Sequence, residues 1–284
     1  MEDLQILINF FAFLVLFTVL FFASIEDIKY REISNKCWKF LIGVGLLKIT
    51  TINIIIYLFS SSYNSQSLTI TPIFMELIQL SIGIIIGFIL YRVGLFGGGD
   101  FKAVIVISLF IPSISDIQIT QGTLYSENIF IFPIISFYLN LGTLLLFFCA
   151  FIFLYNLIHL KFKLKLAFEG HEHESILKKF IVFFSSLSIS PIKGEPGYYY
   201  LREIVKNNKL IFRFDFKSSE TDLQLIKERY NKELRNVLDF YSKIGINRKE
   251  VWINPIIPLI PFITIDLFLL IFIGDIILII SHLF

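Results

Sequence analysis

Two aspartates stand where a pair of carboxyl groups could hydrolyse a peptide bond. Asp27 follows the first apolar run, and Asp100 ends the glycine run 97–99 before a later apolar run. If the two side chains meet, their like charges oppose full ionisation, so the pair shares a proton. The ionised member can then act as general base on water while the protonated member hydrogen-bonds the peptide carbonyl. Which aspartate holds the proton stays open, because coupled groups titrate as a pair.

Each aspartate alone also has an ordinary structural explanation. Charged residues beside a membrane segment commonly only set its orientation, and a glycine run is usually a turn. The glycines would still help a site, because a backbone without Cβ atoms admits a substrate and can adopt positive φ. No serine–histidine or metal arrangement competes, and we expect no metal and no cofactor. His171 and His173 are two residues apart, a spacing that does not share one helical face.

The composition is that of a membrane protein. Of the 284 residues, 56% are hydrophobic, and the mean hydropathy is +0.76, whereas soluble domains contain roughly 45–50% apolar residues. The two cysteines, Cys37 and Cys149, supply neither a disulfide framework nor a CxxC zinc site. We therefore expect the lipid bilayer to be the main solvent of the chain, and we expect no nucleic-acid partner.

Apolar runs of about 20 residues, the length that crosses a bilayer, divide the chain. They lie near residues 4–23, 38–59, 71–92, 128–160 and 255–282, with a shorter run at about 101–117. The predicted fold class is mostly α: a polytopic membrane bundle of six transmembrane helices with a small mixed α/β cytoplasmic domain. The predicted domains are 1–160 (spans one to five), 161–251 (soluble) and 252–284 (the C-terminal transmembrane helix).

The polar segment 161–251 carries both helix and strand signals. Apolar residues recur at helical spacing from Leu223 to Tyr241, as a core-facing stripe, and Leu210 to Phe216 alternate as in a strand. Trp252, just beyond the segment, is expected to anchor the chain at the membrane interface.

The basic residues place the two aspartates on one side of the membrane, since cytoplasmic loops retain Lys and Arg. Eighteen of the 25 basic residues lie in 161–251, while the loops 60–70 and 113–127 contain none. A topology of six spans with both termini outside places every loop rich in Lys and Arg in the cytoplasm. It puts Asp27 and Asp100 at the cytoplasmic face of the plasma membrane. Lys48, inside a span, is given no role.

The fourth span is short, which favours a cleft. From Phe101 to the residue before Pro112 it measures about 16 Å, half of the hydrocarbon core. Non-helical backbone at that depth is tolerated where it lines protein or a wet cavity, so Asp100 is expected in a cleft. Asp266 and Asp275, in the last span, are further candidates because carboxylates inside a membrane are commonly functional. Asp266 could line the cleft or bond a neighbouring helix, and Asp275 could be interfacial.

The two motifs together resemble a known family, the GxGD aspartyl proteases that process type IV prepilins and archaeal preflagellins. The matching residues are Asp27, Arg31, Ile33, Asn35, Gly97, Gly99 and Asp100. The resemblance extends to Lys102 and to residues 251–261 and 274–275, which are similar to the end of archaeal members. It implies an aspartic-type endopeptidase with catalytic Asp27 and Asp100, in which Arg31, Asn35, Gly97, Gly99 and Lys102 support the site. The implied partners are prepilin or preflagellin precursors, whose short basic leader is cut at the cytoplasmic surface.

Two departures and two alternatives remain. Ser34 takes the position of a common Pro, and the cysteine-rich methyltransferase segment of bacterial relatives is not seen, so we expect peptidase activity without N-methylation. A presenilin-like intramembrane protease is an alternative, but a Tyr-Asp pair is expected there and Asp27 follows Glu26. A cation-coupled transporter could use Asp100 and Asp266 at broken helices, although no inverted repeat is evident.

Overall fold

The chain folds into two compact units in a computed structural model. Unit 1 comprises Met1–Leu145 and Pro258–Phe284, and unit 2 comprises Leu146–Ile257. The structure describes residues 2–30, 33–60, 70–93, 96–111, 133–160, 167–190, 199–214, 223–246, 250–255, 258–274 and 276. Unit 2 thus takes in more of the chain than the predicted soluble segment 161–251.

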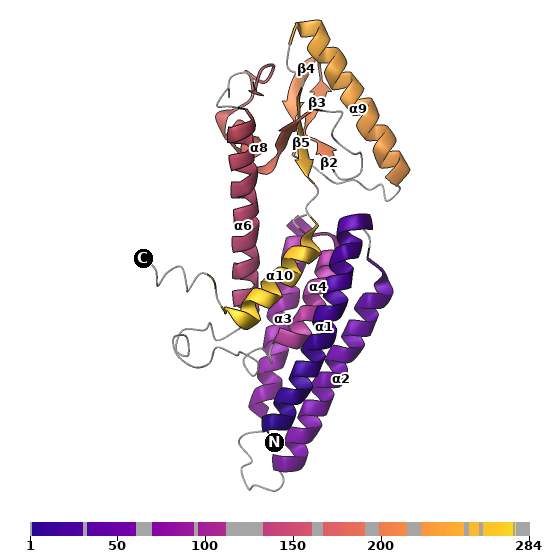
Figure 1. The fold of residues 1–284 in the computed structure, drawn as a ribbon, viewed down its shortest axis with the longest axis vertical. Helices are drawn as coiled ribbons and strands as arrows, with labels where there is room; N and C mark the ends of the chain where they lie inside the picture. Colours follow the sequence, from indigo (N-terminus) through magenta and orange to yellow (C-terminus); the bar gives the residue numbers. More distant parts are fainter. Residues whose placement is uncertain are drawn as a thin grey trace, which may run out of the picture. The chain divides into compact units, whose positions relative to one another are not determined.

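Unit 1 is a bundle of helices (Figure 1). It contains α1 (Glu2–Tyr30), α2 (Asn35–Ser60), α3 (Ile70–Val93), α4 (Gly98–Phe110), α10 (Leu259–Phe272) and the first part of α6 (Pro133–His159). Among the described residues, three helical stretches are long and apolar enough to cross a membrane: Leu4–Tyr30, Asn35–Ile55 and Pro133–His159. The protein is therefore membrane-associated, and the six-span topology stays a prediction.

Several helix ends differ from the predicted spans, because an apolar run marks the lipid-facing part of a helix rather than its hydrogen-bonded extent. α1 continues to Tyr30, so Asp27 lies inside its last turn and not past its end. α4 begins at Gly98, so Asp100 lies in its first turn and not before it. The predicted span 101–117 beyond Ile111 falls outside the described residues. The predicted span 255–282 is wrong at its start, since α10 begins only at Leu259.

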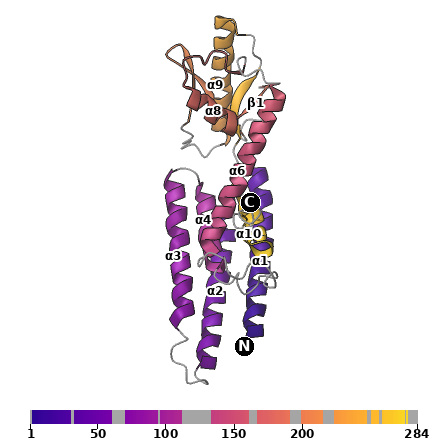
Figure 2. The ribbon, with the colours of Figure 1, turned by 90° about the vertical axis from the view of Figure 1, so that its left-hand side faces the viewer.

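α3 and α4 form an antiparallel hairpin, and they run side by side in both views (Figure 1 and Figure 2). Their close approach depends on Gly83 and Gly87, one turn apart on α3 in the small-xxx-small spacing of tightly packed membrane helices. A Cβ atom at Gly83 would overlap the Ser108 hydroxyl, and one at Gly87 would lie 3.1 Å from Val104 Cγ1. This packing fixes the position of α4 and of the residues at its start.

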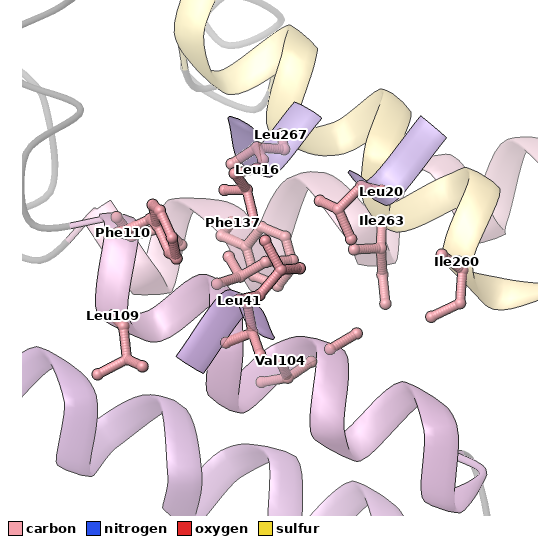
Figure 3. Close-up of a cluster of buried hydrophobic side chains, with 14 of the residues drawn as sticks. Leu16, Leu20, Leu41, Val104, Leu109, Phe110, Phe137, Ile260, Ile263 and Leu267 are labelled. Atoms are coloured by element: carbon pink, nitrogen blue, oxygen red, sulfur yellow. The ribbon is translucent and has the colours of Figure 1, made fainter. Parts of the chain in front are cut away.

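The apolar core of unit 1 gathers side chains from five helices around α4 (Figure 3). Fully buried members include Leu16, Leu20, Leu41, Phe110, Phe137, Ile260, Ile263 and Leu267. From Ala103 to Phe110, every residue of α4 except Ile105 is buried, so this short helix is enclosed by protein on nearly all sides. Burying each large apolar side chain contributes about 1.5–3 kcal/mol, which holds the short helix in place.

Unit 2 contains strands as well as helices. A three-stranded antiparallel sheet has the order β1 (Leu187–Ile189), β5 (Val251–Pro255) and β2 (Tyr199–Leu201). β3 (Glu203–Lys206) and β4 (Lys209–Phe212) form a hairpin. Its turn residues, Asn207 and Asn208, have φ values of 52° and 55°, as a type I′ turn requires. The unit also contains α8 (Ile176–Ser185), α9 (Leu223–Ile244) and the second part of α6.

For this region, one prediction is confirmed, one is confirmed in part and one is wrong. α9 covers the predicted helix, and its residues Val237 and Tyr241 are buried in the core of unit 2. β4 matches the start of the predicted strand, although it ends at Phe212. Trp252 is not an interface anchor: it is completely buried in β5, and its Nε1 donates to Ala167 O at 2.9 Å. The indole rings need apolar surroundings and the indole N–H needs one acceptor. A protein core supplies both as well as a membrane interface does.

Candidate active site

Asp27 lies half-buried in the last turn of α1, against the start of α10. Its Oδ2 accepts a hydrogen bond from the backbone N–H of Ile260, with an N–O distance of 3.2 Å. One turn further along both helices, the hydroxyl oxygens of Ser24 and Thr264 are 2.9 Å apart. Two polar contacts therefore tie α1 to α10 and orient the Asp27 carboxyl group.

Asp100 lies at the third position of α4 and folds back on the helix start. The backbone N–H of Gly97 donates to Asp100 Oδ2 at 2.7 Å, and Gly97 is the N-cap residue with φ −78° and ψ 171°. A carboxylate at this position that accepts from the N-cap N–H is the acidic half of a capping box. The contact holds the carboxyl group beside the N-terminus of α4.

The glycines leave this end of α4 open rather than turning the chain. Gly98 and Gly99 are helical, and a Cβ atom at either would meet no described atom within 4 Å. None of the residues 97–99 has a positive φ, so the chain does not use the left-handed conformation that glycine permits. An N-cap uses extended backbone instead. Glycine supplies open space beside Asp100, which a substrate backbone could enter.

The two carboxyl groups are close enough to interact electrostatically. Asp100 lies outside the three stretches that are long enough to cross a bilayer, and it precedes the apolar part of α4. Burial raises the pKa of Asp100 to about 6, although the hydrogen bond from Gly97 lowers it, and the Asp27 carboxylate adds to the rise. The pair therefore retains one proton up to about pH 6, as general acid–base chemistry with two carboxyls requires.

Asn35 and Lys102 also meet at this site. Asn35 is the first residue of α2, and its Oδ1 accepts from Lys102 Nζ at 2.6 Å. The contact joins the starts of α2 and α4, which are 67 residues apart in the sequence. Arg31, the other charged residue of the first motif, lies outside the described residues.

Two charged side chains lie deep in unit 1, away from its helix ends. Asp266 on α10 is completely buried, six residues and about 9 Å along the helix from Ile260. Lys48 on α2 is 3% exposed, and its Nζ lies 5.7 Å from the centre of the Phe110 ring. Asp275 falls outside the described residues.

The two histidines lie in unit 2, in different surroundings. His173 is exposed, whereas His171 is completely buried with Nε2 2.8 Å from Glu203 Oε1. Glu203 Oε2 also accepts from the Tyr241 hydroxyl at 2.6 Å and from the Trp252 N–H at 3.1 Å. His171 thus belongs to a hydrogen-bonded network in the core of unit 2.

Sequence reasoning missed one participant of the site, the Ile260 N–H. A main-chain donor leaves no mark in residue identity. The available signal was the spacing of Pro258 and Pro261, which marks where α10 begins.

Comparison with protein families decides the assignment of the chain. The model of the type IV leader peptidase family matches residues 14–160, just over half of the chain and the part that contains Asp27 and Asp100. The chain belongs to the type IV leader peptidase family. A second family model, that of the archaeal peptidase A24 C-terminus type II, matches residues 168–276. The resemblance noted from the two motifs and from the archaeal-type C-terminal segment is thereby confirmed, and the protein is a protease of that family.

No curated protein and no solved structure matches the chain.

Proposed function

We propose that the chain is an aspartic endopeptidase that removes short basic leaders from type IV prepilin-like or preflagellin precursors at the cytoplasmic face of the plasma membrane. The observation that carries the proposal is that Asp27 and Asp100, from two motifs on two helices, lie close enough for their charges to interact. The family supports the reaction and the class of precursor. The multi-pass topology and the side of the membrane rest on the distribution of basic residues.

In this proposal, the two carboxyl groups carry hydrolysis through paired proton transfers. The ionised carboxyl takes a proton from water as the water oxygen bonds to the peptide carbonyl carbon, and the protonated carboxyl gives its proton to the carbonyl oxygen. The tetrahedral intermediate then collapses, the carbonyl re-forms and the C–N bond breaks. The leaving nitrogen takes up a proton from the first carboxyl, while the second recovers its own.

Other motif residues are proposed to support the site. Gly97 holds the Asp100 carboxyl group, and Gly99 keeps the approach to it open. The contact between Asn35 and Lys102 keeps the starts of α2 and α4 together. Arg31 completes this set by its place in the first motif. The proposal includes no N-methyl transfer.

The test is cleavage of a precursor that carries a short basic leader followed by an apolar helix, with the new N-terminus identified by mass spectrometry. Asp27→Asn and Asp100→Asn should each lower the rate by about 10²–10⁴-fold, because each removes a proton-transfer group. Asp239→Asn, at an exposed position on α9, is the matched control and should cleave normally. Undiminished cleavage in either site variant would refute the pair. Cleavage within the apolar helix, rather than at the leader, would point to a presenilin-like protease.

A further inference from the structure

The start of α10 has few backbone donors. The first four N–H groups of a helix have no acceptor within the helix. In α10 the N-cap residue is Pro258 and the third helical residue is Pro261, and neither has an N–H. Only two of the four positions, Leu259 and Ile260, therefore carry a donor.

One of these two donors is used by the proposed catalytic pair. Pro258 provides no side-chain cap for α10, and the Ile260 N–H donates instead to Asp27 Oδ2 on α1, 233 residues earlier in the sequence. Asp27 thus takes the role that an N-cap carboxylate usually plays, but from another helix. A helix N-terminus carries a partial positive charge, so this contact favours the ionised form of Asp27.

α10 is held so that this N–H stays directed at Asp27. The hydroxyls of Ser24 and Thr264 bridge the same two helices one turn further along. At the other end, Asn140 on α6 donates to Gly274 O and accepts from Ile276 N, both at 2.9 Å. Polar contacts at both ends thereby oppose sliding or rotation of α10.

We propose that the proline-bounded start of α10 positions Asp27 and stabilises its ionised form through the Ile260 N–H. This inference rests on the proposed function and deepens it, because it names the main-chain group that holds one of the two catalytic carboxyls. Ile260 is a positioning residue that acts through its main-chain N–H.

Other charged groups lie on the elements around Asp27 and bear on its ionisation. In the described part of the chain they are Glu26 and Lys29 on α1, Lys36 and Lys39 on α2, Asp100 and Lys102 on α4, and Asp266 on α10. The variants below leave all of them unchanged, so a shift in the pH profile reports the loss of the N–H.

The test removes the N–H of Ile260 and measures cleavage against pH. Ile260→Pro deletes the donor in the first turn, where proline is tolerated. We expect kcat to fall about 10–100-fold, the loss of a hydrogen bond to a charged group, with KM changed less than about threefold. The acidic limb of the profile should move up by about one pH unit, because a higher pH is then needed to ionise Asp27.

Two controls separate the N–H from packing and from proline itself. Ile260→Ala keeps the donor but loses buried side-chain volume, and it should lower thermal stability while leaving the acidic limb in place. Leu259→Pro adds a proline at the neighbouring position, after a residue whose ψ of 109° suits a following proline, and it should also leave the limb in place.

Each outcome decides the proposal. If wild type cleaves and Ile260→Pro keeps the wild-type kcat and acidic limb, the inference fails while the proposed function stands. An equal shift of the limb in Ile260→Ala would also refute it, because packing would then explain the effect. If Ile260→Pro does not fold, replacing the Ile260 amide by an ester removes the N–H and keeps the side chain. If wild type cleaves no leader, the proposed function fails and this inference fails with it.

Discussion

Glu174 in unit 2 is buried and Asp100 in unit 1 is partly buried, and their pKa values move in opposite directions. At Glu174, burial works to raise the pKa, but hydrogen bonds from Lys178 and from the Phe212 N–H, with the Lys178 charge, hold it below its ordinary range. At Asp100, burial raises the pKa to about 6, and the Asp27 carboxylate adds to the rise.

Burial is the largest influence on both pKa values, and the neighbours decide whether it is offset. Unit 2 gives its carboxylates cations or several donors: Glu233 lies 2.9 Å from Arg213, and Glu203 is surrounded by His171, Tyr241 and the Trp252 N–H. Unit 1 brings two carboxyl groups together, which costs stability. A carboxylate that is paired with a cation or with several donors stabilises the fold. A pair of like-charged carboxyl groups is instead expected where a protein performs acid–base chemistry.

The largest expected effect on stability comes from breaking the network in unit 2. Glu203→Ala leaves the buried donors of Tyr241 and Trp252 without their acceptor, and it should lower the free energy of unfolding by about 3–5 kcal/mol. Glu250→Ala is the control, because the Glu250 side chain is 31% exposed beside His159 and should contribute about 1 kcal/mol or less. Denaturant unfolding of the full chain in detergent, with hydrogen exchange to locate the loss, measures both. Equal losses would show that the buried network around Glu203 contributes no more than the exposed Glu250 contact.

A smaller effect is expected in unit 1 from crowding the α3–α4 hairpin. Gly83→Ala places a Cβ atom against the Ser108 hydroxyl and should cost about 1–3 kcal/mol. It should also slow cleavage, because it displaces the helix that carries Asp100. Gly43→Ala is the matched control: its Cβ meets no described atom within 4 Å, so the variant should keep or slightly gain thermal stability. Ser108→Ala, combined with Gly83→Ala, should recover part of the loss.

The smallest expected effect is a pH dependence of opposite sign in the two units. The Asp100 pKa is raised, so its stabilising contribution is complete below the ordinary value of 3.8 and is lost as the pH rises to about 6. The Glu174 pKa is lowered, so its contribution is complete above 4.5 and is lost as the pH falls through the lowered pKa.

Hydrogen exchange, corrected for its intrinsic pH dependence, measures these two trends separately. Protection in α4 should decrease between about pH 4 and pH 6, and protection at the start of α8 should decrease below about pH 4.5. Cleavage should fall about tenfold per pH unit above pH 6, as Asp100 loses its proton. A common pH trend in both helices would contradict the comparison.

The sequence indicated the parts of the site that reside in side chains. The two motifs predict Asp27, Asp100, Asn35 and Lys102 as site residues, and charge bias predicts that the motifs share one side of the membrane. The helix ends were missed, because hydropathy detects apolar residues and α1 continues through a charged turn to Tyr30. Main-chain groups were also missed.

Trp252 shows the same limit for side chains. Its type and place beside an apolar run fitted a membrane interface, but the decisive acceptor, Ala167 O, is contributed by a residue 85 positions away. Local sequence does not record such long-range pairing.

The two tethers of α10 have a consequence for how its sequence can change. Each residue of an α-helix adds about 1.5 Å and turns the helix by about 100°. Inserting or deleting one residue between Ile260 and Gly274 would therefore rotate one end away from its partner, either Asp27 or Asn140. The length of this segment is therefore constrained more strictly than its residue identities. Apolar side chains in α10 can be exchanged, whereas an insertion or a deletion cannot be accommodated.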